Sequence, residues 1–539
     1  MIMPHCLRNL FMTTVLATIA MGLTASSVIG DEEPEVLTAG PVHEAFAETA
    51  SFDPEPGIVV PKAPPSPIEE VPPEEKPEGD VQWVSGYWAW DDDRDGFIWV
   101  SGIWRVPPPG RQWIPGYWNE TDTGYQWISG YWLDVNASEA DYLPEPPESV
   151  EAGPNSNAPS PDHTWIPGCW LWRSGRYVWR PGYWAAMYPD WDWVPSHYVW
   201  TPMGFVFVGG YWDYTVIRRG VLFAPVVFPF GWILPPPPFF FTPSFVIDMH
   251  VFYDHLFLRP RYHHYYFGDY YARKYYSRGV YPWFSLHARK RCYDPIYAHE
   301  RWRNRHDHDW ENRLEKRYQE RRQSRDIRPP RTLVEYQERQ RKAGSKRPLE
   351  PAIAEPLTKM AKGKDTPFRF QRLNEKERQV IREGQKDVRA FRNNRKEQET
   401  RAQKGTQERP VGKIEPKRVK IERSPINSQK VRQTDKSGQV ERDKNPPSRY
   451  KVPKSEPNVE PLRRRSNVRE QQTQGRKEDG GQVSRNKGQQ LQDRGQRLER
   501  QEQPVEGRGT KRDSQGQNQA REHQGSGKSS DRDYRQKGR

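Results

Sequence analysis

Aromatic residues return at regular intervals between residues 83 and 212, inside a phrase of the form Trp-x-(Ser/Pro)-Gly-x-Trp. Successive copies begin 16, 14, 14, 38, 14, 14 and 14 residues apart, so a segment of about fourteen residues repeats with one long insertion. This spacing predicts a repeat architecture in two groups of four copies. Six clear copies begin at Trp83, Trp99, Trp113, Trp127, Trp165 and Trp179, and two degenerate copies begin at Trp193 and Phe207.

Turn signals divide each repeat into short segments. Pairs such as Asp95-Gly96 and Ser174-Gly175 favour turns, and they leave room for strands of four or five residues. The segments between them are rich in aromatic and β-branched residues, which favour strands. We therefore expect a mainly β fold, built as an antiparallel meander of short Trp-rich hairpins.

The spacing of the tryptophans also predicts which of them pair. Pro115 and Gly116 suit the two central positions of a type II turn, which would place Trp113 opposite Trp118. A second turn around Asp122-Thr123 would place Trp118 opposite Trp127. Carried across the sheet, this pattern predicts a tryptophan ladder along one face, with Ile and Tyr side chains on the other.

A tryptophan ladder allows two interpretations. In the first, the indoles form the core, because so large an apolar side chain is rarely left in solvent. In the second, exposed indoles bind a ligand, since sugar rings stack on aromatic faces. The ligand-binding candidates under the second interpretation are Trp113, Trp118, Trp127, Trp132, Trp179 and Trp184.

Composition divides the rest of the chain. Residues 1–30 resemble a signal peptide, with Arg8 ahead of a fourteen-residue apolar stretch that is shorter than the ~20 residues of a membrane helix. We expect an acidic, Pro/Glu-rich disordered linker at 31–82, the repeat domain at 83–220 with a disordered insertion at 133–164, and an aromatic and His-rich extension at 221–310 that packs on the repeats. The composition of residues 311–539 predicts a basic, low-complexity tail that is largely disordered with short helices.

These features predict a secreted, periplasmic or envelope-associated protein without a transmembrane span in the mature chain. The tail carries 62 Lys and Arg against 34 Asp and Glu, a net charge of +28, so residues 1–310 carry −15 of the total of +13. Such a tail could bind an anionic envelope polymer or polysaccharide, and export makes nucleic acid the weaker candidate. Cys169 and Cys292 could pair outside the cytoplasm, although Cys169 also fits as a small apolar residue.

One stretch could bind a metal ion. Asp91, Asp93, Asp95 and Gly96 match the opening of a calcium loop, which takes oxygen ligands from a tight turn. Gly102 stands where that loop needs its last Glu ligand, and a longer solvated hairpin loop explains the same residues. We therefore expect no cofactor.

The repeated phrase, with Trp-Ile-Pro-Gly-Tyr-Trp at Trp113 and Trp-Arg-Pro-Gly-Tyr-Trp at Trp179, resembles the YXWGXW/WXXGXW-repeat proteins, secreted Trp-rich proteins of planctomycete-type bacteria. The resemblance implies export and a bacterial envelope setting, but no activity. We expect a non-enzymatic structural or interaction protein. One alternative is a module that binds glycan or cell-wall polysaccharide through exposed indoles, and a second is a metal-dependent envelope enzyme.

Overall fold

The computed structural model describes residues 33–52, 54–229, 240–285, 293–343, 352–364, 366–404 and 416–426. The chain divides into two compact units, Met1–Val459 and Glu460–Arg539, and every described residue belongs to the first. The expected signal peptide, Cys292 and the tail beyond residue 426 lie outside the described residues.

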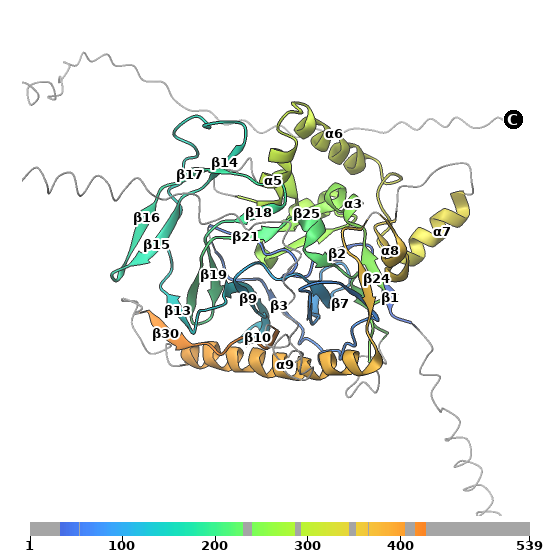
Figure 1. Ribbon diagram of the computed structural model, residues 1–539, viewed down its shortest axis with the longest axis horizontal. Helices are drawn as coiled ribbons and strands as arrows, with labels where there is room; N and C mark the ends of the chain where they lie inside the picture. The colour runs from blue at the N-terminus through green and yellow to red at the C-terminus, as the bar shows by residue number, and fades with distance from the viewer. Residues whose placement is uncertain are drawn as a thin grey trace, which may run out of the picture. The chain divides into compact units, whose positions relative to one another are not determined.

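Short antiparallel strands dominate the fold, and every described helix longer than five residues lies at or after Pro295 (Figure 1). The expected mainly β class, with many short hairpins in small sheets, is confirmed. No helix within the described ranges is long and apolar enough to cross a membrane.

The structural unit contains two copies of the phrase rather than one. Each unit has four strands: the two middle strands form an inner hairpin, and the first and last strands pair with each other as an outer ladder. We name the units A (residues 82–105), B (111–134), C (163–186) and D (191–214). Their strands are β5 Gln82–Val84, β6 Tyr87–Asp91, β7 Gly96–Val100 and β8 Ile103–Arg105; β9 Arg111–Ile114, β10 Tyr117–Thr121, β11 Gly124–Ile128 and β12 Tyr131–Asp134; β14 His163–Ile166, β15 Cys169–Arg173, β16 Arg176–Arg180 and β17 Tyr183–Ala186; β18 Trp191–Val194, β19 His197–Thr201, β20 Gly204–Val208 and β21 Tyr211–Tyr214.

Unit B illustrates the pairing. Trp118 lies opposite Trp127 in the inner hairpin, as the nine-residue spacing predicted. Trp113, however, lies opposite Trp132 in the outer ladder, so the predicted type II turn that pairs it with Trp118 is wrong. At Pro115-Gly116 the chain continues from the outer ladder into the inner ladder and does not reverse direction. The partner chain makes the matching passage at Ser129-Gly130, from the inner ladder into the outer one.

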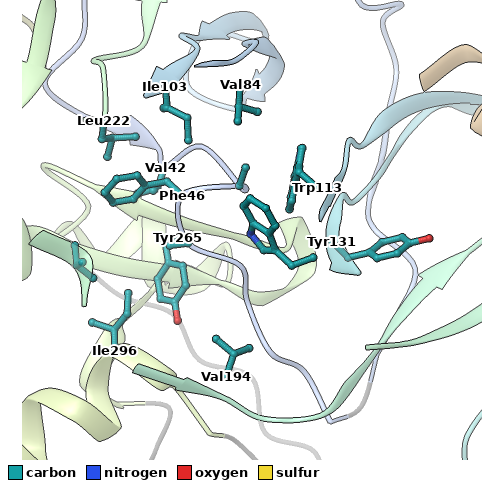
Figure 2. Close-up of a cluster of buried hydrophobic side chains, with 14 of the residues drawn as sticks. Val42, Phe46, Val84, Ile103, Trp113, Tyr131, Val194, Leu222, Tyr265 and Ile296 are labelled. Atoms are coloured by element: carbon teal, nitrogen blue, oxygen red, sulfur yellow. The ribbon is translucent and has the colours of Figure 1, made fainter. Parts of the chain in front are cut away.

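The described residues 33–52 and 54–82, which lie in the stretch 31–82 expected to be a disordered linker, are instead ordered. Within them Val42 and Phe46 have no exposed surface, and Figure 2 shows both side chains inside the main apolar cluster. The Pro and Glu content suggested disorder, but the apolar residues between them pack against the repeats. Four short strands form here: β1 Glu35–Val36, β2 Gly40–Pro41, β3 Val59–Val60 and β4 Glu75–Pro77.

The insertion between units B and C, at residues 133–164, is also more structured than expected. It contains β13 Glu139–Leu143, which pairs with β20 of unit D and with β30 Lys417–Lys420 of the tail. Residues 144–162, by contrast, contain no strand or helix. The side chains of Tyr142 and Leu143 are buried, which explains why this part of the insertion is held in place.

The extension at 221–310 packs on the repeats, and its Leu222, Tyr265 and Ile296 lie in the same apolar cluster as Trp113 of unit B (Figure 2). Here β22 (Gly220–Val221) pairs with unit A through β8, and β23 (Val226–Val227) joins β1 to β7. The remaining elements are β24 Phe245–Ile247, α3 Met249–Phe252, β25 Leu256–Arg259, β26 His264–Phe267, α4 Arg273–Ser277, β27 Tyr281–Pro282 and α5 Pro295–Arg303.

The described part of the tail forms helices that pack on the β structure. Figure 1 shows the thirty-residue α9 (Glu375–Lys404) beside β10, and its Val388 and Phe391 are buried in the main cluster. On the same helix Val380 is 49% exposed, whereas the adjacent Ile381 is buried. The other tail elements are α6 Trp310–Gln323, α7 Leu333–Ala343, β28 Ala354–Pro356, α8 Leu357–Lys362 and β29 Phe370–Arg372.

Candidate functional site

The breaks inside each unit bring two glycines together, and in unit A their N–H groups bind a buried carboxylate. Glu70 accepts hydrogen bonds from the backbone N–H of Gly86 and of Gly102, both at 2.9 Å. Its Oε1 also accepts from the indole N–H of Trp99 at 2.7 Å. We call this arrangement a glycine-pair site: two glycine N–H groups and one indole N–H around a Glu carboxylate.

Unit B repeats the arrangement with Glu44. The N–H groups of Gly116 and Gly130 donate to its carboxylate at 3.3 and 3.1 Å, and the indole of Trp127 donates at 3.1 Å. Both Glu44 and Glu70 come from the stretch expected to be a disordered linker. This stretch therefore supplies the groups that join the two halves of units A and B.

Burial controls the protonation of both carboxyls. Desolvation raises the pKa of Glu70 to about 7, although the hydrogen bonds from Trp99, Gly102 and Gly86 favour the ionised form. Desolvation likewise raises the pKa of Glu44 to about 7, against its bonds from Trp127 and the glycines. Each glycine-pair site therefore holds a carboxyl that titrates close to neutral pH.

In unit C the carboxylate comes from the insertion. Glu151 accepts from the N–H of Gly168 at 2.5 Å and from the indole N–H of Trp165 at 3.3 Å. Unlike Glu44 and Glu70, Glu151 is only partly buried.

Unit D departs from this pattern, because Ser196 occupies the first glycine position. The Ser196 hydroxyl accepts from the N–H of Gly210 at 2.9 Å, in place of a carboxylate. Glu48 contacts unit D through side chains and not through the glycine N–H groups. Its carboxylate pairs with the ring Nε2 of His197 at 3.1 Å and accepts from the Tyr211 hydroxyl at 2.7 Å.

The same geometry explains why the phrase requires glycine. A Cβ at Gly130 would lie 2.4 Å from Cζ2 of Trp113, and one at Gly182 would lie 2.4 Å from Cζ2 of Trp165. In both cases the first tryptophan of one copy covers the glycine of the other copy. The phrase Trp-x-x-Gly-x-Trp therefore encodes the contact between two copies, which accounts for its fixed spacing.

The predicted ligand-binding tryptophans fall into two groups. Trp113, Trp127 and Trp132 are buried, so the structure contradicts an exposed ladder in unit B. Trp118 is partly buried and donates its indole N–H to the carbonyl of Trp88 at 2.9 Å. Trp179 and Trp184 are partly exposed in unit C, where none of the five tryptophans is buried.

The predicted calcium turn is occupied by the chain's own cations. Asp93 pairs with Lys274 and Arg278 at 2.8 and 2.9 Å, Asp95 pairs with Lys62 at 2.8 Å, and Asp91 pairs with Arg94 at 3.6 Å. Burial alone would raise the pKa of Asp93, but hydrogen bonds from Lys274 and Tyr275 and the charge of Arg331 lower it to about 2. Across the described residues, no three His, Cys, Asp or Glu side chains are grouped as a metal site. Asp93 therefore anchors unit A to the extension, Asp95 pairs with the stretch before the repeats, and Asp91 pairs within unit A.

A buried ion-pair network joins unit A to unit D. Arg105 donates two hydrogen bonds to Asp213, at 2.7 and 2.6 Å, and Arg219 pairs with Asp213 at 3.1 Å and with Asp192 at 2.8 Å. Asp192 and Asp213 lie opposite each other in β18 and β21, so the two arginines neutralise neighbouring buried charges. The sequence carried no signal for this network, because its members are far apart along the chain.

Comparison with known proteins identifies the repeat. A family model described as the WXXGXW repeat, two copies long, matches residues 83–105, 113–132 and 161–185. These three matches coincide with units A, B and C, so the two-copy match corresponds to one structural unit. No curated protein and no solved structure matches the chain.

Proposed function

We propose that this chain, which carries matches to the WXXGXW repeat at residues 83–105, 113–132 and 161–185, is a non-enzymatic, exported structural and interaction protein of the bacterial envelope. The observation that carries the proposal is that the repeats of units A and B bind other segments of the same chain. In units A and B the glycine N–H groups bind the chain's own Glu70 and Glu44, so these groups are not available to a ligand. In these units the repeats serve as a framework.

The framework is suited to holding segments of distant origin together. A linker segment enters units A and B through Glu70 and Glu44, and α9 of the tail binds unit B through Glu399, which accepts from the Tyr117 hydroxyl at 2.6 Å. Arg395 on the same helix donates to Glu399 at 2.9 Å and to the Pro115 carbonyl at 2.9 Å. This bracing supports a mechanical or scaffolding role.

Export is tested by expressing the full-length chain in a bacterial host, separating the cell fractions and determining the mature N-terminus by mass spectrometry. The proposal expects an envelope or extracellular fraction and a chain that begins near residue 31. An intact N-terminus together with recovery in the cytoplasm would contradict export.

Attachment to the envelope is proposed to involve the basic tail and an anionic polymer. Exposed charges are screened within about 8 Å at physiological ionic strength. Retention of the full chain on envelope fragments should therefore collapse between about 0.05 M and 0.5 M salt. Retention that does not change with salt would contradict this attachment.

Glycan binding remains a second candidate, because the indoles of unit C are partly exposed. If the contact of an indole with a sugar ring contributes as much as an aromatic pair, about 0.5–1.5 kcal/mol, Trp184→Ala should weaken retention on cell-wall polysaccharide about 3- to 10-fold. Phe240→Ala, at an aromatic side chain that is 50% exposed outside unit C, is the matched control. Equal retention of both variants would rule out this candidate.

A further inference from the structure

Three of the four inner hairpins carry a third strand on the same edge. In units A, B and D the second strand of the hairpin pairs along its outer edge with a short strand from elsewhere in the chain: β23 on β7, β3 on β11 and β13 on β20. The added strands are apolar, with Val226, Val59 and Val60, and Tyr142 and Leu143 at the paired positions.

The corresponding edge of unit C is open. Within the described ranges, β15 and β16 form a sheet of only two strands (Figure 1). In units B and D the added strand pairs with the two residues before the first aromatic residue of the second phrase, and the corresponding residues of unit C are Tyr177 and Val178. Val178 is 39% exposed, whereas Val206, its counterpart in unit D, is 2% exposed. The greater exposure of Val178 marks the surface that a third strand would cover.

The backbone of β16 is suited to such pairing. The hairpin closes at the pair Arg173 and Arg176 around the two-residue turn Ser174-Gly175, whose φ values are 49° and 78°. Since hydrogen-bonded and non-hydrogen-bonded pairs alternate along an antiparallel ladder, the N–H and C=O groups of Tyr177 and Trp179 point away from β15. These groups form the open edge.

The side chains on this edge define the chemistry of the partner. Arg176, Val178 and Arg180 alternate with Tyr177 and Trp179, so the two arginines flank Val178 on one face. No carboxylate partner of Arg173 or Arg176 is present in the described part of the chain, and both side chains are exposed. An antiparallel copy of β16 would place arginine against arginine, and like charges directly opposite are destabilising. A second copy is therefore disfavoured, and an acidic strand is favoured.

We propose that the β16 edge of unit C binds an extended acidic segment of a partner polypeptide by strand addition, with Glu residues opposite Arg176 and Arg180 and a small apolar residue opposite Val178. The proposal rests on the interaction role proposed above and specifies its partner. Main-chain hydrogen bonds would supply the affinity, and the Glu-x-Val-x-Glu pattern would supply the specificity.

The test uses the full chain and a fluorescein-labelled, end-capped peptide, Ser-Glu-Thr-Val-Thr-Glu-Ser, with binding followed by anisotropy at about 0.15 M salt. Arg176→Glu should raise the dissociation constant about 3- to 10-fold, because one attractive pair becomes repulsive. Exchanging the second Glu of the peptide, which faces Arg176 in the antiparallel register, for Lys should restore binding to Arg176→Glu. Arg341→Glu on α7, an exposed site with the same charge change, is the control and should leave binding unchanged.

Strand addition is separated from simple charge attraction by two further measurements. The peptide should slow hydrogen exchange in the segment 176–180. A peptide with Pro in place of the second Thr, which faces Tyr177 and donates its N–H to the open edge, should neither slow this exchange nor bind tightly. Equal binding of the wild type and Arg176→Glu, binding of the Pro peptide, or binding without protection at 176–180 would each overturn the proposal. Dimers that compete with the peptide would also overturn it, in favour of a second copy. Export and salt-dependent retention are measured separately, so their failure is distinguishable from failure here.

Discussion

The glycine-pair sites make the stability of the protein depend on pH, and Glu70→Gln isolates one of them. The unfolded chain releases the Glu70 proton near pH 4.5, whereas the folded chain holds it until about pH 7. Between these values the folded state binds more protons, so the free energy of unfolding falls as pH rises. The separation between the two pKa values corresponds to about 3 kcal/mol, fully present below pH 4.5 and lost above pH 7.

The amide introduced by Glu70→Gln does not titrate, so this loss disappears in the variant. One amide oxygen can still accept from Trp99 and Gly102, but the NH2 group faces the N–H of Gly86. A buried donor without an acceptor costs about 1–3 kcal/mol, and this cost is the same at every pH. The difference in slope between the two profiles of unfolding free energy against pH therefore measures the titration of the Glu70 carboxyl. The difference that does not change with pH measures the lost hydrogen bond.

The assay is urea unfolding followed by tryptophan fluorescence from pH 4.5 to pH 8, for the wild type, Glu70→Gln and the exposed control Glu78→Gln. Relative to the wild type, Glu70→Gln should gain about 3 kcal/mol in stability across this range, and Glu78→Gln should run parallel to the wild type. Other buried groups titrate in both proteins and cancel in the difference. Parallel profiles for the wild type and Glu70→Gln would refute the reasoning.

Three further predictions follow from the packing. Gly130→Ala should destabilise unit B by about 3 kcal/mol in urea unfolding, because the new methyl group overlaps an indole. Gly96→Ala, whose added Cβ would have only one contact, at 3.6 Å, should be nearly neutral. Equal effects of the two substitutions would contradict the account of the motif. Arg105→Met should cost about 3–5 kcal/mol, since it leaves a buried carboxylate with less compensation, and a neutral result in the same assay would contradict the ion-pair network. Cys169 is buried and its thiol pKa is raised to about 11 by burial, so peptide mapping should find it unlabelled by thiol reagents in the native protein at pH 8, and rapid labelling would contradict its burial.

Local signals predicted part of the fold. The nine residues between Trp118 and Trp127 include a tight turn, so their pairing could be inferred from spacing alone. At Pro115-Gly116, however, a turn and a crossing between ladders need the same residues, and only the distant partner strand decides between them. The pairing of Trp113 with Trp132 was therefore missed.

The carboxylates of the glycine-pair sites were missed for a different reason. Glu44 and Glu70 lie in a stretch whose average composition is that of a disordered linker, yet each stands beside apolar residues that are buried, such as Phe46 and Val71. A second signal was available. A glycine that lies between the two ladders has no strand partner for its N–H group, so this group needs another acceptor when it is buried. Together these signals would have pointed to a carboxylate from outside the repeats.

The central claim is that pairs of phrases close around shared carboxylates, and NMR of the glycine amides tests it most directly. In protein labelled with 15N-glycine, the amides of Gly86 and Gly102 should shift together with a midpoint near pH 7, and both shifts should vanish in Glu70→Gln. Gly79, which has no heavy atom within 4 Å of its Cβ position, is the internal control and should not show this transition. Amides of Gly86 and Gly102 that do not titrate, or that titrate unchanged in Glu70→Gln, would contradict the account.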